Sequence, residues 1–219
     1  DNGSIELTAN QDISLGTDGD VTSGQSGEIS VLSANGSFTQ DSGNVIDGGT
    51  GQVSVNAQSN TTIANIKTST SDVVVYSQAG DIAVNEGIST ADANVSIEAD
   101  GGSIASISGI ATSEGDISIS AKQNIDLSAD ADVLSDASGS VNVLAEDGHF
   151  IQESGNVING GTGVIDIESE GDAVIANLTT TTSGIDVLSN AGDIFVNEGI
   201  STTSAAIGLL ADKGSITSI

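Results

Sequence analysis

Residues 95–99 read Val-Ser-Ile-Glu-Ala, an order of apolar, polar, apolar, polar and small side chains. A five-residue pattern with apolar residues at the first and third positions and a small residue at the fifth returns ten times along the chain. Alternation with a period of two is typical of a β-strand that buries one face. The first position is Ile or Val in every case: Ile5, Ile29, Val53, Val73, Val95, Ile117, Val141, Ile165, Ile185 and Ile207.

A column of small residues closes these ten segments. Ala or Ser stands four positions after the first apolar residue each time. Such a column indicates a corner at which the wall of the molecule bends inward and leaves no room for a larger side chain. The ten residues are Ala9, Ser33, Ala57, Ser77, Ala99, Ala121, Ala145, Ser169, Ser189 and Ala211.

A longer repeat contains this short one. The first 107 residues return at an offset of 112, and 53 of the 107 pairs are identical. Self-similarity at a fixed period marks units that bury their apolar faces on one another. We therefore divide the chain into copy 1 (residues 1–112) and copy 2 (residues 113–219), each with five coils, the last one incomplete, in one continuous solenoid. Because the chain duplicates a building block, a unique active site is not expected.

Further strands are predicted in each coil. Weaker apolar positions at Val21, Val45, Ile88 and Ile110 indicate a short third strand, and turn signals such as Asn35-Gly36 separate the strands. A second strand is expected eight to ten residues after the first one begins, at Ile13, Phe38, Ile63, Ile82, Ile104, Ile125, Phe150, Ile175, Ile194 and Ile216.

These columns predict an all-β fold, a parallel β-helix (β-solenoid) of about ten coils of 20–24 residues with two or three strands each. Hairpins of a sandwich or of an antiparallel barrel are the alternative, because Asn-Gly and Asp-Gly turns favour hairpins. A sandwich, however, does not place one residue class at one position ten times. Coils of this length without a hexapeptide rhythm favour right-handed winding. At about 4.8 Å per coil, the rod would be about 48 Å long.

The charge of the chain excludes several partners. It has 31 acidic residues against three Lys and no Arg, a formal net charge of −28. This charge repels a phosphate backbone, so no nucleic-acid partner is expected. A bilayer is spanned by about 20 consecutive apolar residues, and the chain contains no such run. It is therefore not expected to cross a membrane. It also has no Cys, which excludes disulfide bonds.

Three stretches carry a resemblance to a known group: Phe-Thr-Gln-Asp-Ser-Gly-Asn-Val-Ile at residues 38–46, Ala-Gly-Asp-Ile-Ala-Val-Asn at 79–85, and Val-Ser-Ile-Glu-Ala followed by Gly-Gly-Ser-Ile within 95–104. With them, nearly the whole chain resembles the repetitive β-helical shafts of secreted bacterial exoproteins, such as filamentous haemagglutinin-like adhesins. The resemblance implies export through an outer membrane, display on the bacterial cell surface, and attachment or filament formation. The chain is expected to be a window of a longer array.

The function predicted from these observations is mechanical. The chain is expected to be a structural segment of a long extracellular bacterial filament, stalk or adhesin shaft, and not an enzyme. Its expected partners are further copies of the same repeat, by end-to-end continuation or stacking, and other cell-surface components. A calcium-dependent or carbohydrate-binding adhesive module is the alternative, and a polysaccharide-degrading β-helix enzyme is a third hypothesis.

No catalytic, cofactor-binding or metal-ligating residue is assigned, and no cofactor is required. Calcium is a candidate ligand at Asp18-x-Asp20 and Asp130-x-Asp132, because alternating carboxylates in a turn suit an ion that takes six to eight oxygens. Two carboxylates do not complete such a shell. The competing interpretation is a solvated turn in which Asp bonds to nearby backbone.

Other candidates have simple structural interpretations. His149, the only histidine, is expected to be an outward, solvated residue rather than the base of a Ser-His-Asp triad. Gly-Gly-Thr-Gly at residues 48–51 and 160–163 partly matches a calcium-binding repeat, but a glycine corner between strands accounts for it. Asp166 and Asp186 are predicted to be neighbours on adjacent coils, where their like charges would need a cation or water.

Overall fold

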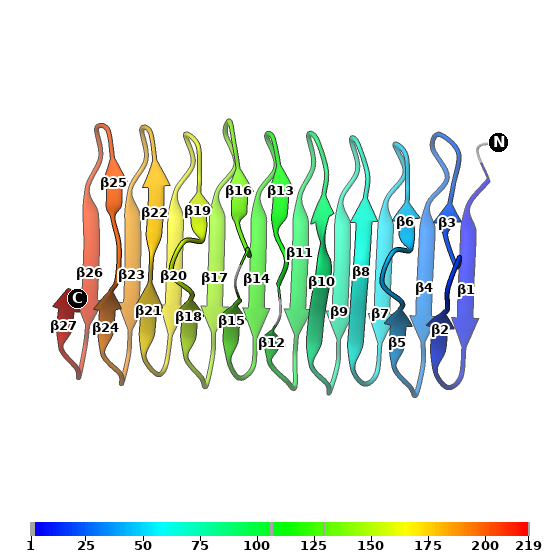
Figure 1. Ribbon diagram of the computed structural model, residues 1–219, viewed down its shortest axis with the longest axis horizontal. Coiled ribbons are helices and arrows are strands. Elements are labelled where there is room, and N and C mark those ends of the chain that lie inside the picture. Colours follow the sequence, from blue (N-terminus) through cyan, green and yellow to red (C-terminus); the bar gives the residue numbers. More distant parts are fainter. Residues whose placement is uncertain (1–2, 106, 129, 219) are drawn as a thin grey trace.

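The computed structural model describes residues 3–105, 107–128 and 130–218, and these form a parallel β-solenoid without helices. The coils are stacked side by side along the long axis of the molecule (Figure 1). The long strands, which lie farther from the viewer, run downward, and the nearer strands run upward as the chain advances from right to left. The coils therefore wind in a right-handed sense. The predicted fold class is confirmed.

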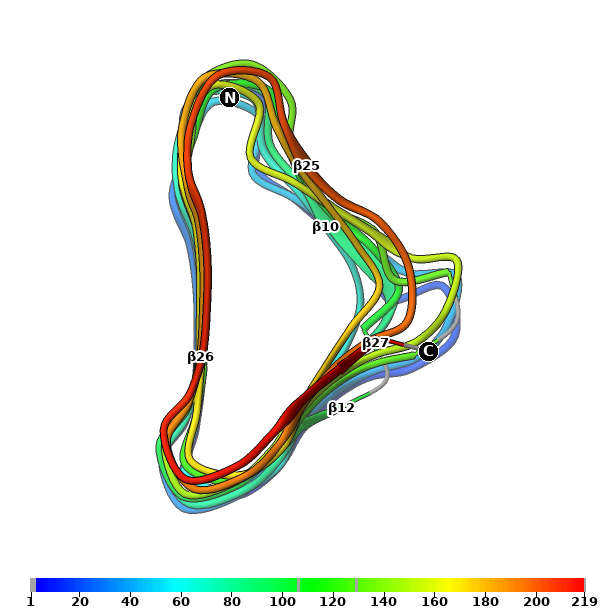
Figure 2. The same ribbon diagram turned by 90° about the vertical axis from the view of Figure 1, so that its left-hand side faces the viewer.

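One wall is a flat sheet of ten parallel strands, seen on the left of Figure 2. Each strand pairs with the equivalent strand of the next coil, so the Ala and Ser residues of the small column lie in register from one end to the other. The strands are β1 (Ile5–Ala9), β4 (Ile29–Ser33), β7 (Val53–Ala57), β9 (Val73–Ser77), β11 (Val95–Ala99), β14 (Ile117–Ala121), β17 (Val141–Ala145), β20 (Ile165–Ser169), β23 (Ile185–Ser189) and β26 (Ile207–Ala211).

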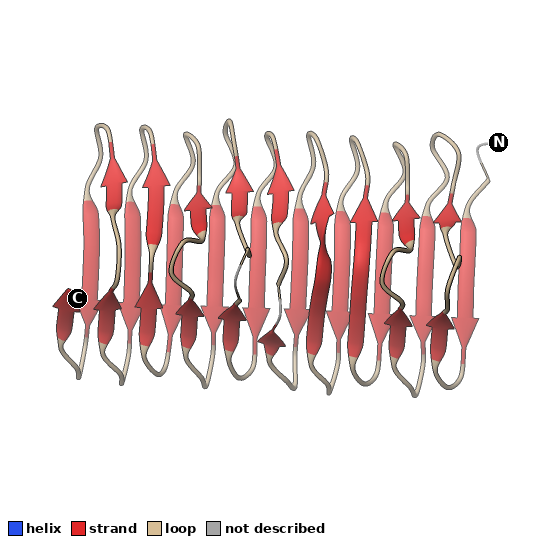
Figure 3. Ribbon diagram, in the orientation of Figure 1, coloured by secondary structure: helices blue, strands red, loops and turns tan. Residues whose placement is uncertain are grey.

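Two narrower walls complete a roughly triangular cross-section (Figure 2). The second wall contains β2 (Ile13–Leu15), β5 (Phe38–Gln40), β12 (Ile104–Ala105), β15 (Ile125–Leu127), β18 (Phe150–Gln152), β21 (Ala173–Ile175), β24 (Ile194–Val196) and β27 (Ile216–Ser218). The third contains β3 (Val21–Thr22), β6 (Val45–Asp47), β13 (Ile110–Thr112), β16 (Val133–Ser135), β19 (Val157–Asn159), β22 (Asn177–Thr180) and β25 (Ile200–Thr202). Two strands, β8 (Thr61–Lys67) and β10 (Ile82–Ser89), run through both walls without a break (Figure 3).

The interior is a stack of aliphatic side chains with one Phe in each copy. Ile29, Val31 and Phe38 of one coil are fully buried, and so are Ile165 and Phe150 in copy 2. Burial of such a side chain contributes about 1.5–3 kcal/mol. Inward side chains of the middle coils are covered by the coils on either side, whereas Ile207 and Ile216 of the last coil are exposed, so this gain depends on stacking rather than on any single coil.

The small column has a second role beyond leaving space. Where it holds Ser, the buried hydroxyl bonds to a backbone carbonyl of the adjoining corner. Ser33 Oγ donates to the Gln11 carbonyl at 2.7 Å, Ser77 Oγ to the Ser59 carbonyl at 2.6 Å, and Ser189 Oγ to the Gly171 carbonyl at 2.8 Å. Ser therefore replaces Ala in this column without leaving a buried donor unpaired.

The expected register of the second wall is wrong in two coils. Thr61, not Ile63, pairs with Phe38, and Ala173, not Ile175, pairs with Phe150. In these coils Thr or Ala occupies the first inward position, so the first large apolar residue is the Ile two residues later. The Ile side chain then fills the next inward position.

The third strand expected at Val45 in coil 2 is present as β6, but its inward residue is the next one. Ile46, not Val45, pairs with Val21 and is fully buried. The backbone N–H of Val45 instead donates to Asp20 Oδ1 at 2.8 Å. The strand thus begins with a partly exposed Val, and its alternation places the following Ile in the core.

Candidate functional site

The corner between the second and third walls varies most from coil to coil (Figure 2). In most coils a loop joins the two strands, but β8 in coil 3 and β10 in coil 4 continue from one wall to the other, and β10 has a register shift between Val84 and Gly87. Coil 3 is correspondingly short, because Val53 and Val73 are only 20 residues apart. Coil 3 therefore has no corner loop between the loop of coil 2 and the irregular segment at Glu86 and Gly87 in coil 4.

A carboxylate bridges this interruption. Glu86 in coil 4 reaches across coil 3, and its Oε1 accepts a hydrogen bond from the Ser42 hydroxyl and another, at 2.7 Å, from the Gly43 N–H of coil 2. The Ser42 hydrogen bond, followed by that of Gly43, lowers the pKa of the Glu86 carboxyl, so it stays ionised. Gly43 has a φ of +85°, a conformation that favours glycine.

Copy 2 contains the same bridge. Glu198 Oε1 accepts from the Ser154 hydroxyl and, at 2.9 Å, from the Gly155 N–H. Its other oxygen accepts a hydrogen bond from the Asn177 amide in the short coil between them. The Ser154 hydrogen bond makes the largest contribution to the lowered pKa of Glu198. The bridge is thus a repeated feature of the 112-residue unit.

Two buried amides brace the same corner from inside, and they explain the motif at residues 38–46. Gln40 Nε2 donates to the Asn44 carbonyl at 2.8 Å and to the Asn65 carbonyl at 3.1 Å, and its Oε1 accepts from the Ala64 N–H. Asn44 Nδ2 donates to the Leu15 and Gly16 carbonyls of the preceding coil. Each amide therefore links consecutive coils.

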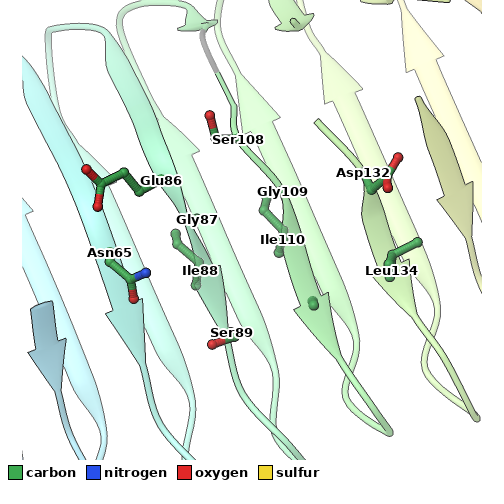
Figure 4. Close-up of a pocket in the computed structure, with 11 residues that line it drawn as sticks. Asn65, Glu86, Gly87, Ile88, Ser89, Ser108, Gly109, Ile110, Asp132 and Leu134 are labelled. Atoms are coloured by element: carbon green, nitrogen blue, oxygen red, sulfur yellow. The ribbon is translucent and has the colours of Figure 1, made fainter. Parts of the chain in front are cut away.

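A shallow hollow of about 230 Å³ lies beside the Glu86 bridge (Figure 4). Gly87 and Gly109 line it, with Glu86 on one side and Asp132 on the other, and the two carboxylates point in opposite directions. Asp132 Oδ1 accepts from the Val157 N–H at 2.8 Å. Both carboxylates thus serve backbone donors of other coils. The lowered pKa of Glu86 does not suit the role of the general acid in glycoside hydrolysis, which needs a raised pKa.

The predicted calcium turns have a structural role. Asp18 and Asp130 adopt left-handed conformations with φ of 63° and 67°. Asp20 Oδ1 accepts the Val45 N–H of the next coil at 2.8 Å, as Asp132 does in copy 2. Within the described part of the chain, no three His, Cys, Asp or Glu side chains are grouped so as to hold a metal ion. Calcium binding at these turns stays a prediction.

His149 precedes β18 on the second wall and is half-exposed. Its Nε2 lies 3.2 Å from Asp126 Oδ1 on the neighbouring coil, and its backbone N–H donates to Asn124 Oδ1 at 3.1 Å.

The glycine segments at residues 48–51 and 160–163 form corners, as expected. Gly49 and Gly161 there have φ of +57° and +54°.

The flat sheet brings the predicted acidic pair together. Asp166 on β20 pairs in register with Asp186 on β23, so their like charges lie on adjacent strands. Burial raises the pKa of Asp166 most, and the charges of Asp186 and Glu168 raise it further. Asn142 precedes Asp166 in the same outward row.

Comparison of the chain with family models, with curated proteins and with solved structures found no match. Among the described residues there is no helix long and apolar enough to cross a membrane.

Proposed function

We propose that this chain is a structural segment of a long extracellular bacterial filament, stalk or adhesin shaft. One observation carries the proposal: the stacking of coils continues from copy 1 into copy 2 with the strand pairing unchanged. β11 of copy 1 pairs with β14 of copy 2 over five residues, Val95 to Ala99 against Ile117 to Ala121, in the same register as strands within a copy. A unit that stacks on its own copy in this way can be repeated to any length.

The corners add a second set of links between coils. At the corner before the flat sheet, Asp72 Oδ1 accepts the Asn94 N–H at 2.9 Å, Asn94 Oδ1 the Asp116 N–H at 2.8 Å, and Asp116 Oδ1 the Ser140 N–H at 2.7 Å. This row passes from copy 1 into copy 2 without interruption. Backbone ladders and corner side chains together oppose separation of the coils along the rod axis.

The partners that we propose are further copies of the repeat, by continuation of the chain or by stacking, and other cell-surface components. β26 carries Ile207 and Leu209 where β11 carries Val95 and Ile97, the inward residues that pack beside β14. A further copy could therefore pair with β26 as β14 pairs with β11. The net charge of −28 would oppose side-by-side clumping of such rods in solution.

The likeness of residues 38–46 and 79–85 to the shafts of filamentous haemagglutinin-like adhesins supports an extracellular, cell-surface location. We propose a non-catalytic role, because the carboxylates of the corner hollow point apart and are engaged by backbone donors. Immunogold labelling of intact cells that make the protein tests the location. We expect label on filaments outside the cell, and label confined to the cytoplasm would overturn the proposal.

A further inference from the structure

The outer face of the flat sheet carries a hollow of about 180 Å³ in copy 1. Leu32 on β4, Asn56 on β7 and Tyr76 on β9 lie in register across three adjacent strands and line it. Leu32 is 42% exposed although it is a large apolar residue. Gln58 and Gln78 line the end near the corner. We call this the Tyr76 hollow.

The side chain of Tyr76 is fixed in place from one side. Its hydroxyl donates to Asp100 Oδ2 at 3.1 Å, and its backbone is paired on both edges within the sheet. Asn56 Nδ2 likewise donates to Ser54 Oγ at 3.0 Å. A ring and an amide that are held before a ligand arrives lose little conformational freedom on binding.

The same place in copy 2 has a different chemistry. Every residue that lines the Tyr76 hollow is uncharged, in a chain of net charge −28. At the offset of 112, three neutral residues become Glu and the ring is replaced by Leu. The pairs are Ala34 and Glu146, Asn56 and Glu168, Gln58 and Glu170, and Tyr76 and Leu188.

This contrast selects the class of ligand. An anion would be repelled by the charge of the whole molecule, and a cation would find more carboxylates at the equivalent place in copy 2. An uncharged ligand is left. A pyranose ring combines an apolar C–H face, which suits an aromatic ring, with hydroxyls that pair with side-chain amides as donors and acceptors. Pockets for small molecules combine apolar lining with a few placed polar groups in this manner.

We propose that the Tyr76 hollow binds a neutral saccharide. The Tyr76 ring and Leu32 would contact the C–H face of the sugar, and the amides of Asn56, Gln58 and Gln78 would bond its hydroxyls. This binding activity goes beyond the shaft role, which needs no ligand. It would make copy 1 an adhesive unit and leave copy 2 a spacer.

The first experiment is a printed array of neutral oligosaccharides built from glucose, galactose and N-acetylglucosamine, beside sialylated and sulfated ones. We expect the full chain to bind neutral members of the array and not the acidic ones. The best neutral oligosaccharide is then titrated in solution. Tyr76 is the only Tyr and there is no Trp, so intrinsic fluorescence reports on this ring alone.

Variants test whether the saccharide binds at the Tyr76 hollow or elsewhere on the rod. Calorimetry measures the affinity of each variant. Tyr76→Ala should weaken binding about tenfold by removal of the aromatic contact. Asn56→Glu, which imports the residue of copy 2, should weaken it comparably without removing the ring. Leu188→Ala, at the equivalent place in copy 2, is the matched control and should leave affinity unchanged. Circular dichroism checks the fold, and if Tyr76→Ala unfolds, Asn56→Glu decides. Failure of the wild-type chain to bind any neutral glycan, a preference for acidic glycans, or undiminished binding by Asn56→Glu would overturn the proposal.

Discussion

Copies 1 and 2 keep one interior and carry different outer faces. On β7 and β20 the inward residues Val53 and Ile165 differ by one methyl group, while the outward residues Ser54 and Asp166 differ in charge. Inward positions are limited by close packing against the coils on both sides. Outward positions on the flat sheet face solvent and can change. Differences in binding between the copies should therefore come from the outward residues, and differences in stability should be small.

The largest expected effect tests whether the two interiors are equivalent. Phe38→Ala and Phe150→Ala each remove a fully buried ring from the same place in the two copies. Each should lower the free energy of unfolding by about 3–5 kcal/mol, through lost burial and the cavity that remains. Urea unfolding followed by circular dichroism measures this loss. A loss below about 1 kcal/mol in one copy alone would show that the interiors are not equivalent.

A smaller effect is expected at the amides that brace the corner. Asn44→Ala removes a side chain that is 2% exposed and bonds to the Leu15 and Gly16 carbonyls and to the Gly19 N–H. We expect a loss of about 1–3 kcal/mol, because buried backbone groups lose their partners. Asn35→Ala, at an exposed corner, is the control and should cost much less. Equal losses at the two sites would contradict the bracing role.

A gain in stability is expected from removing one of the like charges of Asp166 and Asp186. These two residues are neighbours on adjacent strands of the flat sheet in copy 2, and their counterparts in copy 1 are uncharged. Asp186→Val restores the residue that Val74 provides in copy 1 and should stabilise the rod by about 0.2–1 kcal/mol at pH 7. The pKa of Asp166 is raised, so the folded state binds its proton more readily than the unfolded chain does. The repulsion is therefore absent at low pH and grows as the pH rises through the folded pKa.

The same variant should consequently lose its advantage on acidification. Urea unfolding at pH 7 and at about pH 4 gives the two differences between variant and wild type. An advantage that grew at the lower pH would contradict repulsion between the charges of Asp166 and Asp186. Ser54→Ala in copy 1, which changes no charge, serves as the control for pH.

A local effect is expected from the carboxylate bridges. Glu198→Gln replaces the acceptor of the Ser154 hydroxyl and the Gly155 N–H, while Glu86→Gln does the same to Ser42 and Gly43. Amide hydrogen exchange by NMR should become faster at the glycine of the altered copy and stay unchanged in the other. Because the pKa of each Glu is lowered, this protection should be present above the ordinary Glu pKa and lost as the pH falls through the folded value. Faster exchange in both copies from a single substitution would argue against a local bridge.

The smallest effect is expected for calcium. Asp20 and Asp132 already accept backbone N–H groups, so addition of calcium or of a chelator should not shift the thermal midpoint of unfolding. A rise with calcium that disappears in the double variant Asp18→Asn and Asp130→Asn would instead establish calcium sites in these turns.

Much of the fold could be predicted because its strands show a period-two alternation of apolar and polar residues. The Ile and Val columns and the Ala or Ser column repeat at every coil, so ten weak signals combine into one architecture. The register of Thr61 was missed because the first inward position of that coil holds Thr rather than a large apolar residue, and the alternation alone does not show where a strand enters the wall. Ile46 was missed for the same reason, since Val45 beside it is equally apolar.

Little of the surface could be predicted, because its contacts skip coils. Glu86 can accept hydrogen bonds from Ser42 and Gly43 because the intervening coil lacks a corner loop. No local sequence pattern predicts this contact between coils. The signal that was available is the return of Glu86 and Ser42 as Glu198 and Ser154 at the same offset. The Tyr76 hollow could have been found by comparing the outward residues of the two copies once their strands were aligned.

Distances between labelled coils test the stacking most directly. The chain has no Cys, so cysteines placed at Ser30 and Asn142, on the outer face of the flat sheet, can be labelled selectively with nitroxides. These positions lie five coils apart, and double electron–electron resonance should give about 24 Å between their backbones, with about 4.8 Å less when the second label moves one coil nearer, to Ser118. Distances that do not change in steps with the number of coils would contradict a continuous stack.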